Sequence, residues 1–184
     1  FDLTESPTWQ GIRPGCYAPQ EEFDQTYKVH VDSRPKKNSK IKTGVASLTG
    51  RIPDLYVSAL GALKAQCVFT PMFSAFGPDP IAQRLQLGRI RVLVTTPMLY
   101  RRKVAGIVDR LPDLELVLIC GATEDQTAGS ATGAGGPRVL SMGSFLCDAT
   151  DTFEIGYTDP ETPALLHFTS GTTGTPKGAV HVHG

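Results

Sequence analysis

A chain of 184 residues with 18 basic and 18 acidic side chains has room for one domain and carries no formal net charge. The zero balance argues against nucleic acid or an anionic membrane as the main partner. A content of 40% hydrophobic and 20% charged residues is that of a soluble globular chain. We expect no transmembrane helix and no signal peptide, because no long apolar run and no basic, apolar N-terminus occurs. The chain begins with Phe1 rather than Met, which indicates a piece of a longer protein.

The four cysteines predict no disulfide framework and no metal site. They are Cys16, Cys67, Cys120 and Cys147, and no two of them form a C-x-x-C pair. Cysteines inside apolar runs behave as small hydrophobic residues. We therefore expect reduced thiols in a cytoplasmic protein.

Residues 1–44 show no regular pattern and are predicted to be a separate N-terminal segment. Within them, residues 34–42 hold five cations in nine positions. A phosphate-binding patch is one interpretation of this run. A solvated connector is favoured, because no aromatic residue is interleaved and the net charge is zero.

From residue 45 onward, apolar runs alternate with helical periodicity. Strands are expected near residues 45–48, 67–70, 90–95 and 114–120, with helices over 52–66, 80–87 and 98–110 between them. The strand runs are apolar throughout, which is typical of strands covered on both faces. The sequence therefore predicts an α/β fold of layered βαβ units with a largely parallel sheet. The expected apolar face of the first helix consists of Ile52, Leu55, Tyr56, Ala59, Leu60 and Leu63.

Residues 121–144 contain six glycines and are predicted to be a loop. Three nearby carboxylates, Glu124, Asp125 and Asp148, have no spacing that indicates a metal site. Residues 159–163 form an expected rigid turn, and residues 164–168 an apolar strand that leads into the most informative segment.

The segment 169–178 (TSGTTGTPKG) has the composition of a phosphate-binding loop. Glycine lets the backbone approach an anion, and hydroxyl side chains donate hydrogen bonds to phosphate oxygens. Lys177 adds a mobile positive charge. The loop is not a Walker A motif, because Pro176 and Gly178 stand where that motif needs Gly and Ser or Thr. A plain hydrophilic surface loop is the alternative, and the position of the Lys after Pro makes it the weaker one.

The stretch 168–178 (FTSGTTGTPKG) resembles the signature loop of the AMP-forming adenylating enzymes. Further segments are similar to the acetate–CoA ligases of that superfamily. These are residues 50–57 (GRIPDLYV), 61–65 (GALKA), 73–78 (FSAFGP), 92–97 (VLVTTP), 159–168 (DPETPALLHF) and 179–183 (AVHVH). The resemblance implies that residues 45–184 are part of the N-terminal large domain of an AMP-forming acyl-CoA synthetase.

The same resemblance implies a two-step reaction with Mg-ATP, acetate and coenzyme A. Acetate attacks the α-phosphorus of ATP to give acetyl-AMP and pyrophosphate, and the thiol of coenzyme A then displaces AMP. In this chain Lys177 would offset charge on the leaving pyrophosphate, as electrostatic stabilisation of the transition state. Arg101 and Arg102 would meet coenzyme A phosphates, although a solvated helix turn is the alternative. The phosphate cradle would consist of Thr169, Ser170, Gly171, Thr172, Thr173 and Gly174.

Two alternative functions stay open. The chain could belong to a synthetase for another small carboxylate such as propionate, or be a non-catalytic phosphate-binding remnant. The isolated chain is expected to be inactive, because the family's magnesium-binding acid and catalytic lysine lie downstream of this loop.

His181 and His183 alternate as on one face of a strand, where a metal pair is conceivable but a structural strand is favoured. His167 is expected to be a core residue.

Overall fold

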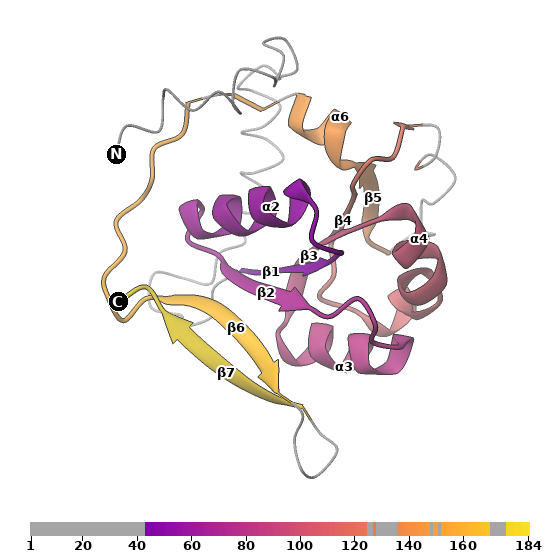
Figure 1. The fold of residues 1–184 in the computed structure, drawn as a ribbon, viewed down its shortest axis with the longest axis horizontal. Coiled ribbons are helices and arrows are strands. Elements are labelled where there is room, and N and C mark those ends of the chain that lie inside the picture. The colour runs from indigo at the N-terminus through magenta and orange to yellow at the C-terminus, as the bar shows by residue number, and fades with distance from the viewer. Residues whose placement is uncertain (1–42, 125–126, 128–135, 148, 151, 170–175) are drawn as a thin grey trace.

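The computed structural model of the chain describes residues 43–124, 127, 136–147, 149–150, 152–169 and 176–184 (Figure 1). The N-terminal segment predicted over residues 1–44 lies almost wholly outside these ranges, and its division from the rest of the chain stays a prediction. Within the described ranges, no helix combines the length and the apolar character needed to cross a membrane.

The described residues form a seven-stranded sheet in the order β5-β4-β3-β1-β2-β6-β7. β7 is antiparallel to β6, and each of the other neighbouring pairs is parallel. The α/β fold with a largely parallel sheet is therefore confirmed. The strands are β1 (Gly44–Leu48), β2 (Val68–Met72), β3 (Ile90–Thr95), β4 (Leu116–Ile119), β5 (Arg138–Ser141), β6 (Pro163–Thr169) and β7 (Lys177–Val182).

Helices follow the first three strands, as expected for βαβ units. The helix predicted over 98–110 is confirmed as a continuous helical span, but it changes from α to π to 3₁₀ turns along its length. Thr96 caps this span, because its hydroxyl accepts a hydrogen bond from the Leu99 amide. The helical elements are α2 (Pro53–Lys64), α3 (Pro78–Leu87), α4 (Pro97–Leu99), η2 (Tyr100–Val104), η3 (Ala105–Arg110) and α6 (Met142–Cys147).

The sheet is covered on both faces by separate apolar clusters. Side chains of α3, η2 and η3 pack against one face, where Leu48, Leu93 and Val117 are fully buried. The other face contacts α6 and the start of α2, around Val94 and Leu118. This two-sided burial explains why β4 is apolar along its whole length and why most residues of β1 and β3 are apolar.

Two sequence predictions need correction. The glycine-rich loop expected over 121–144 contains β5 and the first turn of α6, and β5 pairs in parallel with β4. Only the two apolar residues Val139 and Leu140 mark this short strand, so its pattern was too weak to separate from a loop. Tyr56 and Leu60, placed on the buried face of the first helix, are 58% and 56% exposed.

The strand order places several loops at one edge of the sheet. β1 lies between β2 and β3, so the chain reverses its direction of travel across the sheet at β1. In open α/β sheets, ligands bind outside the carboxyl ends of the strands near such a reversal. β6 is parallel to β2, so the residues that follow β6 lie at the same edge as those that follow β1, β2 and β3.

Two glycines give opposite predictions for the stability of this fold. A Cβ added at Gly44 would lie 2.9 Å from the carbonyl oxygen of Gly88, whereas one added at Gly61 in α2 would have open space. We expect Gly44→Ala to lower the free energy of unfolding by about 1–3 kcal/mol through this backbone clash. Gly61→Ala should raise it by about 0.5–1 kcal/mol, because alanine is the better helix former. Chemical denaturation of both variants measures this, and a Gly44→Ala variant as stable as the wild type would contradict the packing described here.

Candidate functional site

The candidate site is built on the hairpin of β6 and β7. Thr169 and Lys177 form the pair of residues nearest its loop, and the Thr169 hydroxyl donates to the Lys177 carbonyl oxygen over 3.4 Å. The hairpin therefore brings together the two ends of the phosphate-binding loop predicted from the sequence. The remaining residues of the predicted cradle lie outside the described residues: Ser170, Gly171, Thr172, Thr173 and Gly174.

The register of the hairpin gives it one polar and one apolar face. Thr169 pairs with Lys177, and His167 pairs with Ala179. Directly opposed residues of an antiparallel pair share a face, so the Thr169 and Lys177 side chains lie together. All of these residues are exposed. Glycine at position 178 belongs to the other face, where an added Cβ would lie 2.9 Å from Leu166 Cδ1.

Lys177 is available for an anion. Its side chain is exposed, and within the described part of the chain no ion pair involves its ammonium group. Pro176, just before it, is buried and fixes the backbone where the chain enters β7. A free lysine on a short, anchored strand can act as a mobile point charge for a polyphosphate.

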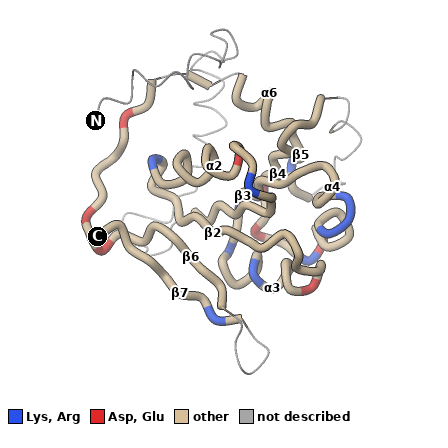
Figure 2. The backbone as a smooth tube through the Cα atoms, in the orientation of Figure 1, with Lys and Arg blue, Asp and Glu red and all other residues tan. Residues whose placement is uncertain are grey.

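A second basic group lies at the same edge of the sheet. Arg101 and Arg102 are exposed on η2, in the helical span that starts directly after β3 (Figure 2). Their neighbour Lys103 has a different role, because its ammonium donates to the carbonyl oxygens of Ser74 and Phe76 at 2.6 and 2.8 Å. The two arginines are therefore the free cations of this turn, and the lysine ties the helix to the loop after β2.

The strand order gives the spacing between β3, which leads to the helical span of Arg101 and Arg102, and β6, which leads to the hairpin loop. β3 and β6 are separated by β1 and β2. Neighbouring strands lie about 4.8 Å apart, so the two strands are about 14 Å from one another.

The described residues offer no nucleophile and no magnesium ligands at this edge. Burial, with a smaller effect from the Asp54 carboxylate, raises the pKa of the Cys120 thiol to about 12, so this thiol stays protonated. No three His, Cys, Asp or Glu side chains of the described residues come together as metal ligands. We therefore assign no magnesium ligand and derive no step through that ion.

The prediction that His167 is a core residue is wrong. The His167 side chain is exposed, and its ring contacts that of His181 across the hairpin, with the ring centroids 5.3 Å apart. The run 164–168 looked uniformly apolar, but β6 joins the parallel sheet through a single pair, Phe69 and Leu165. Beyond that pair only the face of β6 that carries Leu166 and Phe168 is half-buried, whereas His167 and Thr169 on its other face are exposed and β7 is exposed along its length.

Three comparisons with known proteins indicate the family and the fold of this chain. Residues 36–184 match the family model described as "AMP-binding enzyme". The acetyl-coenzyme A synthetase of Bacillus subtilis is 35% identical over 133 residues, which are 72% of this chain and 21% of that protein. That of Bdellovibrio bacteriovorus is 30% identical over 144 residues, with the same coverage of each chain.

A solved structure supports the same fold. An anthranilate CoA ligase, AuaEII, in complex with anthranoyl-AMP, superposes with a TM-score of 0.66 at 23% identity, over 79% of this chain and 26% of that one. The chain thus spans about a fifth of the length of the curated relatives that it matches. The family model covers well over half of the chain, and on that basis the chain belongs to the family of AMP-binding enzymes.

Proposed function

We propose that this chain supplies the phosphate-binding part of an AMP-forming ligase that activates acetate with ATP and transfers the acetyl group to coenzyme A. The observation that carries the proposal is the pairing of Thr169 with Lys177, which anchors the glycine- and threonine-rich loop at the carboxyl edge of a parallel sheet. Acetate would attack the α-phosphorus of Mg-ATP, forming acetyl-AMP and releasing pyrophosphate. The thiol of coenzyme A would then displace AMP.

In this proposal the chain positions the phosphates and stabilises their negative charge, rather than transferring protons. Lys177 would bind the β- and γ-phosphates and offset the negative charge that grows on the departing pyrophosphate. Thr169 would donate from the same face of the hairpin, and the backbone amides and hydroxyls of residues 170–174 would complete the cradle. The strand already fixes the backbone of Lys177, so the freedom that remains to be lost on binding is that of its side chain.

Arg101 and Arg102 would bind phosphates of coenzyme A. Both are exposed at the edge of the sheet where the loop begins. Guanidinium groups suit phosphate, because their planar donors bind two oxygens at once. A cytoplasmic location is part of the proposal, because no two of the four cysteines form a C-x-x-C pair and no disulfide framework is expected.

Acetate is proposed as the acid because both curated relatives are acetyl-coenzyme A synthetases. The anthranilate ligase shares the fold and acts on a different acid, so the fold itself does not select acetate. Propionate or another small carboxylate is the alternative substrate. A phosphate-binding remnant without catalysis is the alternative of a different class.

The contribution of Lys177 can be measured by binding. We expect the 184-residue chain to bind inorganic pyrophosphate and the Lys177→Ala variant to bind it about tenfold to a hundredfold more weakly, because a charge-assisted hydrogen bond is lost. Isothermal titration calorimetry is the measurement. Lys64→Ala, which removes a charge from the end of α2, is the matched control and should bind like the wild type. Equal losses in the two variants would mean that only net charge matters, against the proposed cradle.

Catalysis can be tested with a chimera. Residues 44–184 would replace the matched segment of the Bacillus subtilis acetyl-coenzyme A synthetase, and acetate-dependent exchange of pyrophosphate into ATP would be followed. We expect exchange by the chimera, a large loss with Lys177→Ala, and none by the 184-residue chain alone. Exchange by the isolated chain would refute the expected inactivity. A chimera that melts cooperatively but exchanges with neither acetate nor propionate would favour the remnant.

A further inference from the structure

Two histidines on the hairpin have no part in the reaction proposed above. His167 on β6 and His181 on β7 lie diagonally across the strand pair, since His181 is directly opposite Leu165. Their rings are in contact at a centroid distance of 5.3 Å with an angle of 77° between the ring planes. Both side chains are exposed, so neither is needed to fill the core.

We propose that His167 and His181 form a two-imidazole binding site for a divalent transition metal ion. A zinc–nitrogen bond is about 2.0–2.1 Å long and structural sites are tetrahedral, which puts the centroids of two coordinated imidazoles about 5 Å apart. The centroid distance of 5.3 Å matches this requirement. The rings now meet edge to face, and turning them about χ2 brings one nitrogen of each toward a shared point. This torsion has a broad distribution in histidine and the rings are exposed.

The ligand set indicates which ions would bind. Neutral imidazole suits zinc, copper and nickel, whereas magnesium and calcium prefer oxygen ligands. Within the described residues no third His, Cys, Asp or Glu side chain completes the set, so water would fill the other positions. Its two nitrogen ligands therefore differ from the oxygen ligands that a magnesium ion prefers.

The position of the pair suggests what the ion would do. A metal ion bound to both histidines would join β6 to β7 two residues from the Thr169 end of the hairpin. Such a link would hold the two strands in register and would resist opening of the hairpin. Because His167, His181, Lys177 and Thr169 share one face, the ion would also add positive charge on the side where Lys177 lies.

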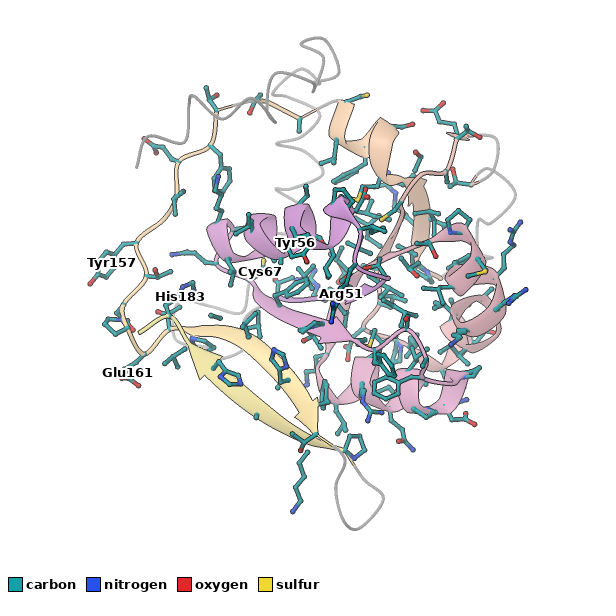
Figure 3. All side chains as sticks on the ribbon, viewed as in Figure 1. Arg51, Tyr56, Cys67, Tyr157, Glu161 and His183 are labelled. Carbon is teal, nitrogen blue, oxygen red and sulfur yellow. The ribbon has the colours of Figure 1, made fainter. Side chains whose placement is uncertain are left out.

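Nickel is a suitable probe, and the chain offers a matched control. Calorimetric titration of the 184-residue chain with Ni²⁺ at pH 7.5 is expected to show one saturable site. His167→Ala and His181→Ala should each weaken binding at least tenfold, since each removes one of two ligands. His183→Ala should bind like the wild type, because His183 lies at the end of the hairpin away from the loop (Figure 3). Circular dichroism checks that each variant folds.

Amide hydrogen exchange gives a second measurement, which does not depend on the variants. Ni²⁺ should slow exchange of the amides shared by β6 and β7 in the wild type and leave α3 unchanged. The proposal is overturned if the wild type does not bind Ni²⁺, if the His167→Ala/His181→Ala double variant binds as tightly as the wild type, or if His183→Ala loses as much affinity as the single variants. Binding of pyrophosphate by the double variant remains a separate readout for the phosphate loop.

Discussion

The antiparallel pairing of Thr169 with Lys177 is the constraint on which the site depends. It fixes where the loop leaves β6 and where it enters β7, and it places the one lysine of the loop on the same face as a threonine hydroxyl. Without that pairing the glycine-rich segment would be a flexible chain that pays the full entropy of ordering when it binds an anion. Gly178 lies on the other face of the hairpin, where a Cβ would be 2.9 Å from the end of the Leu166 side chain, so that side chain would have to shift for a larger residue.

The parallel sheet determines where this hairpin lies. β2 is parallel to both β1 and β6, so β6 runs in the same direction as the central strands. The end of β6 at Thr169 and the helical span of Arg101 and Arg102 after β3 consequently follow the carboxyl ends of parallel strands, at the same edge of the sheet. The Lys103 bonds to the carbonyls of Ser74 and Phe76 brace that turn against the loop after β2.

Periodicity predicted the central strands and helices because both of their faces are covered. The apolar run 90–95 corresponds to β3 residue by residue. The sequence predictions are wrong where the two faces of an element are not both covered. His167 sits in an apolar run, yet it belongs to a hairpin with only one covered face. Tyr56 and Leu60 lie on an apolar stripe that the described residues leave exposed. β5 was missed because a four-residue strand after several glycines has too little pattern.

The candidate site was likewise predicted only in part from the sequence. Composition indicated a phosphate loop and Lys177, because glycines, hydroxyl residues and one lysine can be recognised without a fold. The partners across the hairpin could not be predicted, since register depends on the conformation of the loop. The separate roles of Arg102 and Lys103 also needed the structure, because adjacent cations look alike in a sequence.

Amide chemical shifts test the central claim most directly. Titration of the isotope-labelled chain with inorganic pyrophosphate, followed by ¹H–¹⁵N NMR, should shift the amides of residues 169–178 first and most strongly. The chemical shifts of the α2 amides should not change, because α2 lies on the face of the sheet opposite α3, η2 and η3. Shifts confined to residues 34–42, with residues 169–178 unchanged, would contradict the account, because the phosphate would then be held by the basic N-terminal segment instead of the hairpin.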